Sequence, residues 1–132
     1  MNKQYAEYGP TLLRVFLGLL MLIPGIGKLM DPAGPIGMLT NLGFIMPVVS
    51  AWVLLLSEIV FGICIILGFK VRYTIWPLVV ILTVATIFIV VPNMNGNYVN
   101  LLFHLQAIAG MITIYLIGPG KWPIGEIMKK KR

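Results

Sequence analysis

Four long apolar stretches alternate with short segments that are polar or rich in glycine and proline. They cover residues 11–30, 46–69, 74–91 and 98–117. A helix needs about 20 mainly apolar residues to cross a bilayer, and each stretch has about this length. A helix also satisfies its own backbone hydrogen bonds, as a lipid-exposed span must. The pattern therefore predicts an all-α fold: a four-helix transmembrane bundle, up-down-up-down, as one domain over residues 1–132.

The segments between the spans carry breaking and capping signals. Two prolines and a glycine in Asp31–Pro35 predict a break after the first span. Ile36–Phe44 is too short to cross a membrane, so we expect an interfacial turn of helix there. Thr83 and Thr86 share one face of the third span, and we expect their hydroxyls to bond to the backbone of their own helix.

Composition and charge placement agree with a membrane protein and predict its orientation. The chain is 59% hydrophobic and only 11% charged, which leaves too little polar surface for a soluble domain. In the predicted topology Lys3, Lys70, Arg72, Lys121 and the basic tail 129–132 all lie on one side. Basic residues beside spans favour the cytoplasmic face, so both termini are predicted to be cytoplasmic. Such residues meet anionic lipid, and no nucleic-acid partner is expected.

A few charged and polar residues interrupt the apolar stretches at helical spacing. Residues three and four apart lie on one helix face, so three such faces are predicted. They are Arg14, Gly18, Met21, Gly25 and Lys28 in the first span; Ala51, Leu55, Glu58, Gly62 and Ile65 in the second; and Asn100, His104, Ala107 and Met111 in the fourth. Ionisable groups avoid hydrocarbon and glycines allow close helix approach, so these faces should point into the bundle.

The depths of these residues in the bilayer suggest which groups meet. At 1.5 Å per residue, Arg14 lies roughly 5 Å from the cytoplasmic ends of the spans, Glu58 roughly 16 Å and Lys28 roughly 26 Å. Glu58 is thus about equally far from both bases. Side chains lean toward the N-terminus of their helix, which brings Lys28 and Glu58 together. We therefore expect a cluster of Lys28, Glu58 and His104 with Asp31 and Asn100 at its mouth. An Arg14–Glu58 pair, or an Arg14 that reaches back to the interface, is the alternative.

Several kinds of chemistry are excluded or left open by this cluster. One histidine and one nearby carboxylate fall short of the three or four ligands of a zinc site, so no metal site is predicted. Cys64 is the only cysteine, and therefore no disulfide or Cys-x-x-Cys pair forms within one chain. A buried polar cluster of this kind could hold a protonatable headgroup such as a quinone, relay a proton, or simply stabilise the bundle.

Several short motifs, taken in order, resemble the DoxX family of small four-helix membrane proteins from bacteria and archaea. They are Leu12-Leu13-Arg14, Gly25-Ile26-Gly27-Lys28-Leu29, Glu58 with Gly62, Leu67-Gly68-Phe69-Lys70-Val71-Arg72, and Gly118-Pro119-Gly120-Lys121. The positions that match the family pattern are Arg14, Lys28, Glu58 and Arg72. The chain departs from that pattern at Pro24, and at Trp122–Glu126, where relatives often carry an aromatic-Ser-x-Asp ending.

The resemblance implies a function in membrane redox chemistry. Some relatives are named as subunits of a thiosulfate:quinone oxidoreductase, and others are linked to membrane complexes that handle redox stress and thiols. The first interpretation is therefore a subunit of a quinone-linked redox complex in the plasma membrane of a bacterium or archaeon, with quinone as cofactor and other oxidoreductase subunits as partners. The alternatives are a small proton-coupled transporter or lipid-interacting protein, which would form a homo-oligomer, and a structural assembly factor.

Overall fold

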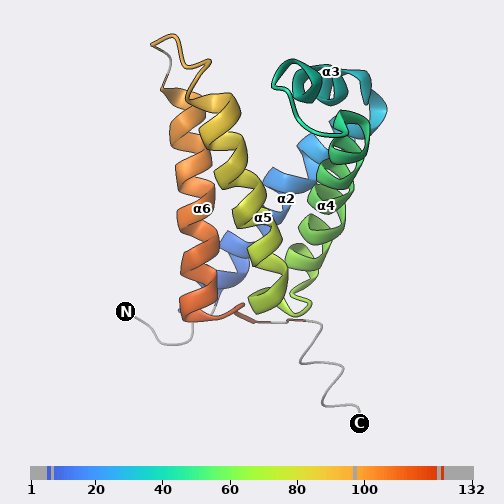
Figure 1. Cartoon of the computed structure of the whole chain (residues 1–132). Coiled ribbons are helices and arrows are strands. Elements are labelled where there is room, and N and C mark those ends of the chain that lie inside the picture. The colour runs from blue at the N-terminus through green and yellow to red at the C-terminus, as the bar shows by residue number, and fades with distance from the viewer. Residues whose placement is uncertain (1–5, 7, 97, 122, 124–132) are drawn as a thin grey trace.

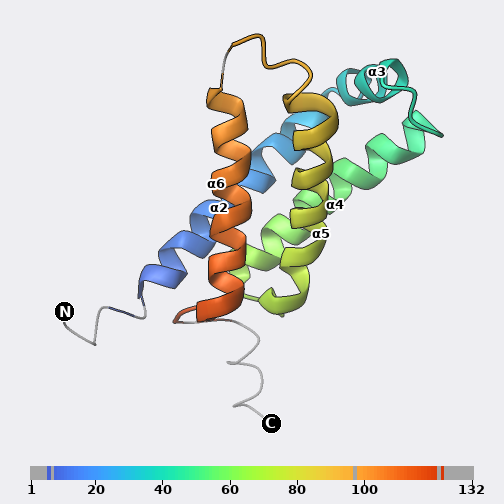
Figure 2. The ribbon, with the colours of Figure 1, turned by 60° about the vertical axis from the view of Figure 1, so that its left-hand side comes forward.

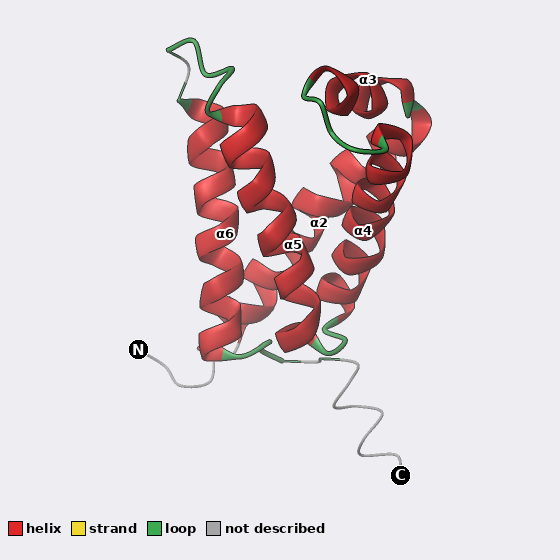
Figure 3. Cartoon of the chain, viewed as in Figure 1, coloured by secondary structure: helices red, strands yellow, loops and turns green. Residues whose placement is uncertain are grey.

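The computed structural model describes residues 6, 8–96, 98–121 and 123. Within these residues every regular element is a helix, as Figure 3 shows, and there is no strand. The elements are α2 (Tyr8–Met30), α3 (Ala33–Asn41), α4 (Pro47–Leu67), α5 (Val71–Ala85), the π-helical turn η1 (Thr86–Val90) and α6 (Val99–Ile117).

The four predicted spans are confirmed. Helices α2, α4 and α6, together with the continuous helix formed by α5 and η1, are each long and apolar enough to cross a membrane. Their ends differ from the predicted ends by a few residues. The π-helical turn was not predicted. Thr83 and Thr86 bond to the carbonyls of Val79 and Leu82 on their own helix, as expected.

Helix α3 shows that the predicted break over Asp31–Pro35 is too long. Only Asp31 and Pro32 lie between α2 and α3, and Pro35 is inside the new helix. Proline is tolerated there because the first turn of a helix needs no intrahelical N–H donors. The loop after α3 contacts η1 through an edge-to-face pair of Phe44 and Phe88, with ring centroids 6.3 Å apart.

The long helices run up, down, up and down, so the start of α2 and the end of α6 lie at the same end of the bundle (Figures 1 and 2). We call this the terminal end, and the opposite one the α3 end. The Thr11 hydroxyl donates a hydrogen bond to the Lys121 carbonyl, 3.1 Å away, across the terminal end. That the terminal end faces the cytoplasm stays a prediction. Lys3 and residues 129–132, on which that prediction partly rests, lie outside the described residues.

Helices α2 and α4 form the most extensive helix pair, and glycines make their close approach possible. A Cβ atom added to Gly18 would lie 2.8 Å from the Gly62 carbonyl oxygen, and one added to Gly62 would lie 3.1 Å from the Gly18 oxygen. A Cβ on Gly25 would lie 3.1 Å from the Cβ of Glu58. The predicted inward-facing glycine faces are therefore the surfaces on which the two helices cross.

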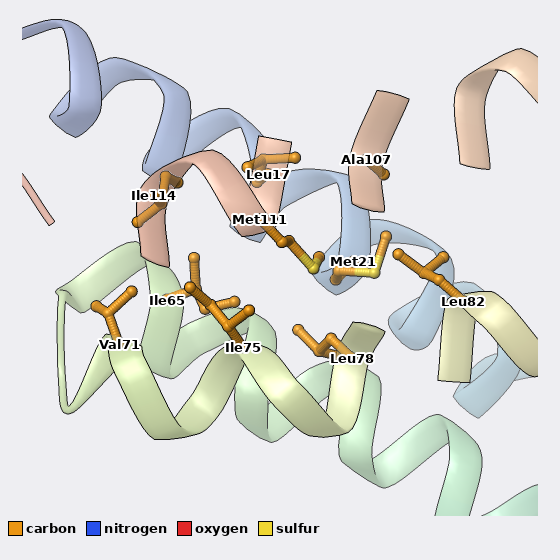
Figure 4. Packing of buried hydrophobic residues seen from close by; sticks show 10 residues of the cluster. All are labelled: Leu17, Met21, Ile65, Val71, Ile75, Leu78, Leu82, Ala107, Met111 and Ile114. Carbon is orange, nitrogen blue, oxygen red and sulfur yellow. The ribbon is translucent and has the colours of Figure 1, made fainter. Parts of the chain in front are cut away.

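The apolar core occupies the part of the bundle toward the terminal end. Its side chains converge from all four long helices (Figure 4). They are Leu17 and Met21 of α2, Ile65 of α4, Val71, Ile75, Leu78 and Leu82 of α5, and Ala107, Met111 and Ile114 of α6. Toward the α3 end this cluster stops, and Lys28, Glu58, Asn100 and His104 lie there.

Candidate functional site

Lys28 and Glu58 form an ion pair between α2 and α4. The Lys28 Nζ atom lies 2.5 Å from Oε1 and 2.7 Å from Oε2 of Glu58, so the ammonium donates to both carboxylate oxygens. The Glu58 side chain is 9% exposed and that of Lys28 29%. The pairing preferred from side-chain direction is the one observed. A carboxylate this deep in a span is costly, and a close cationic partner that donates to both of its oxygens offsets part of that cost.

The local sequence explains how this pair is held. Gly25 lets the α2 backbone approach the base of Glu58, and Ile59 beside it lies equally close to that glycine. Lys28 follows Gly25 by three residues, so it lies on the same face nearly one turn further toward the α3 end. The glycine contact therefore fixes the backbones, and the long lysine side chain closes the remaining distance.

The ion pair lies on the wall of a cavity of about 370 Å³ toward the α3 end. Most of the lining is apolar, and its polar side chains are those of the ion pair, His104 and Asn100. The lining residues are Leu20, Met21, Pro24, Lys28, Glu58, Leu82, Asn100, Phe103, His104 and Ala107. The structure thus brings four of the predicted site residues around one space.

His104 is oriented by its own helix. Its Nδ1 atom lies 2.9 Å from the Asn100 carbonyl oxygen. A carbonyl oxygen only accepts hydrogen bonds, so Nδ1 carries a hydrogen in this contact and Nε2 is left for another partner. The pocket therefore offers an ammonium donor and a carboxylate on one wall and an imidazole on another.

Asp31 and Arg14 take other positions. Asp31 is exposed just beyond α2 and is not among the residues that line the cavity. Arg14 is only 3% exposed and donates a hydrogen bond from Nη1 to the Pro119 carbonyl, 2.9 Å away, at the terminal end. The alternative Arg14–Glu58 pair is therefore wrong. Arg14 instead links α2 to the segment that follows α6. Its Nε atom has no hydrogen-bond partner among the described residues.

The predicted basic anchors gather at the terminal end. Lys70 is the last residue of the turn between α4 and α5, where it adopts a left-handed conformation with φ 42°, and Arg72 lies in the first turn of α5. The Lys121 ammonium lies 4.6 Å from the centroid of the Tyr8 ring. This cation–π contact joins the start of α2 to the segment after α6. That these residues face the cytoplasm stays a prediction.

Most of the apolar lining of the pocket was not predicted from the sequence. Leu20 and Pro24 precede Lys28 at intervals of four residues, and Phe103 stands next to His104, so these positions could have been placed near the cluster from helical spacing alone. The pattern does not show which apolar residues face a cavity and which face lipid. Within the described part of the chain, no three His, Cys, Asp or Glu side chains lie close enough together to hold a metal ion.

Comparison with known protein families shows that the family model DoxX matches residues 9–91 of the chain. The match runs from α2 to the end of η1 and includes Arg14, Lys28 and Glu58. The chain belongs to the DoxX family. Helix α6, which brings Asn100 and His104 to the pocket, follows the matched region of this DoxX protein. No curated protein and no solved structure matches the chain. Four spanning helices and the family match make it a multi-pass membrane protein.

Proposed function

We propose that this DoxX protein is the membrane subunit of a redox complex and binds a quinone headgroup in the pocket between α2 and α6. One observation carries the proposal: a charged pair and an imidazole converge on a cavity whose other walls are apolar. Small-molecule sites typically combine apolar walls with a few placed polar groups. The proposed location is the plasma membrane of a bacterium or archaeon.

The residues fit a quinone headgroup in size and chemistry. The cavity of about 370 Å³ lies at the lower end of the range for ligand sites, which suits a single substituted ring. A quinone carries two carbonyl oxygens, which accept hydrogen bonds. The Lys28 ammonium has three N–H donors and uses two of them on Glu58, so one is available to a ligand oxygen. The Asn100 amide supplies further donors at the α3 end of the same cavity.

The chain's own residues would position the ring and handle protons. A bound quinone supplies two-electron redox chemistry, and its reduction consumes two protons. Glu58 and His104 are groups on the pocket wall that can hold and pass a proton, and Lys28 balances the charge of the Glu58 carboxylate whenever that group has given its proton away. The single cysteine and the absence of a metal-ligating cluster among the described residues leave electron supply to an oxidoreductase partner.

The test is native mass spectrometry of the protein extracted gently from its own membrane. The wild-type chain should retain a quinone or an oxidoreductase subunit, and Glu58→Gln should lose the quinone. Asp31→Asn is the matched control, because it removes a carboxylate that is exposed and does not line the cavity. It should keep the quinone.

Two results would overturn the proposal. A wild-type chain that carries neither quinone nor an oxidoreductase subunit excludes the redox assignment. Quinone retained equally by Glu58→Gln and Asp31→Asn excludes this pocket as its site.

A further inference from the structure

The pocket changes from polar to apolar along the bundle axis. Lys28 is two residues from the end of α2 and Asn100 is one residue after the start of α6, while Glu58 packs against Gly25, nearer the α3 end than Leu20, so the polar side chains lie toward the α3 end of the pocket. Leu20 lies eight residues before Lys28 on α2, which places it about 12 Å deeper toward the middle of the bilayer. Ala107 of α6 is similarly displaced from Asn100, by about 10 Å. The cavity therefore has one polar end at the membrane interface and one apolar end in the hydrocarbon.

The side of the pocket between α2 and α6 is open. The exposed residues of its lining all come from these two helices: Leu20, Pro24, Asn100 and Phe103. Leu20 is 39% exposed and Phe103 55%. Leu20 lies ten residues from the end of α2, about 15 Å along the axis, so the medium to which it is exposed is hydrocarbon rather than water.

The opposite side of the bundle gives no comparable opening into this space. The buried residues Met21, Leu82 and Ala107 close the pocket toward the core. An apolar groove of about 140 Å³ beside α4 and α5 is lined by Phe44, Leu54 and neighbouring residues, and it shares no lining residue with the pocket. Among the described residues, the exposed part of the lining therefore marks the side between α2 and α6 as the lateral route between the pocket and the bilayer.

We infer that the ligand enters sideways from the bilayer through this α2–α6 window and keeps a long apolar tail in it. The headgroup lies against Lys28 and His104 at the α3 end, and the tail leaves between α2 and α6, past Phe103 at the level of the headgroup and Leu20 deeper in the hydrocarbon. This inference rests on the proposed function and narrows its substrate class to quinones with a long isoprenoid tail. Tailless, water-soluble quinones bind the same headgroup site, but they have no tail to contact the window, so the window adds nothing to their affinity.

The test compares two probes with one headgroup, a tailless quinone and a long-tailed isoprenoid quinone, on protein in lipid nanodiscs. Concentrations are expressed per lipid, so that partition into the bilayer cancels. Leu20→Trp and Phe103→Trp fill the window. Ile23→Trp and Leu102→Trp are the matched controls, because these neighbours are 65% and 61% exposed and do not line the pocket.

The window variants should bind the long-tailed quinone at least about tenfold more weakly than wild type, because the added indole occupies the path of the tail. Their loss of affinity for the tailless quinone should be at least about tenfold smaller than their loss for the long-tailed one, and this residual binding also shows that they are folded. Both controls should resemble wild type with both probes.

Two outcomes would overturn the window. In the first, Leu20→Trp and Phe103→Trp bind the long-tailed quinone as tightly as wild type does. In the second, the controls Ile23→Trp and Leu102→Trp lose as much affinity for the long-tailed quinone as the window variants lose. If the tailless probe still binds in a Glu58-dependent manner in either case, the proposed function stands without the window. If neither probe binds wild type, the proposed function itself fails.

Discussion

Removing the lysine of the Lys28–Glu58 pair should destabilise the bundle more than removing both partners. Lys28→Met keeps the length of the side chain and leaves the Glu58 carboxylate, whose side chain is 9% exposed, without its two hydrogen bonds. Losing one partner of a fully buried pair costs about 3–5 kcal/mol. Because the Lys28 side chain is 29% exposed, we expect the lower end of that range, about 3 kcal/mol.

The double variant Lys28→Met/Glu58→Gln should recover most of this loss. Replacing both members of a buried pair with neutral groups of similar size is often neutral. We therefore expect a coupling free energy of about 2 kcal/mol in a double-mutant cycle. The measurement is reversible unfolding in mixed micelles of mild detergent and sodium dodecyl sulfate, followed by circular dichroism. Asp31→Asn serves as the control for removal of an exposed carboxylate and should change the free energy of unfolding by less than about 0.5 kcal/mol.

Additivity would refute the reasoning. Under additivity, the changes in the free energy of unfolding caused by Lys28→Met and by Glu58→Gln sum to that of the double variant within about 0.5 kcal/mol. In that case Lys28 and Glu58 do not stabilise each other. The ion pair would then contribute nothing to the free energy of the folded state. A Lys28→Met variant as stable as wild type would contradict it equally, because Glu58 would not need its counter-charge.

Two further predictions concern the other close contacts of the fold. Gly18→Ala should lower the free energy of unfolding by about 2 kcal/mol, because the added Cβ would lie 2.8 Å from the Gly62 carbonyl oxygen. Gly27→Ala is the control: a Cβ there meets nothing within 4 Å, so this variant should not lower the free energy of unfolding in the same micelle titration. Arg14→Met should release the segment after α6, since the bond to the Pro119 carbonyl is lost, and hydrogen exchange there should rise about tenfold or more. Unchanged exchange in Arg14→Met would show that other contacts hold the segment.

Much of the fold was predictable because membrane spans carry a strong length and composition signal. The four long helices and the glycine faces follow from apolar run length and from spacing of three and four. The extent of α3 did not follow, because Pro35 lies at a first-turn position where a proline does not break a helix. The π-helical turn at Thr86–Val90 was also not predicted, because a single widened turn carries no periodicity of its own.

The candidate site was predictable in its ionisable residues and less so in its partners. Side-chain direction correctly favoured Lys28 over Arg14 as the partner of Glu58. The true partner of Arg14 is a backbone carbonyl, and every residue has one, so the identity of the side chains could not single out Pro119. The cavity itself depends on how far α2 and α6 diverge, and this distance is not encoded in a helical repeat.

The contacts across the terminal end set an order for the assembly of the bundle during translation. Thr11 and Arg14 of the first span bond to Lys121 and Pro119, which follow them by 110 and 105 residues. At 5–20 residues per second, the ribosome needs on the order of 5 to 20 s to make that intervening chain. Throughout this interval the first span carries Arg14 without its carbonyl partner. Helix α2 can therefore pack against α4 and pair Lys28 with Glu58 early, whereas its terminal-end contacts form only after residues 119–121 have been made.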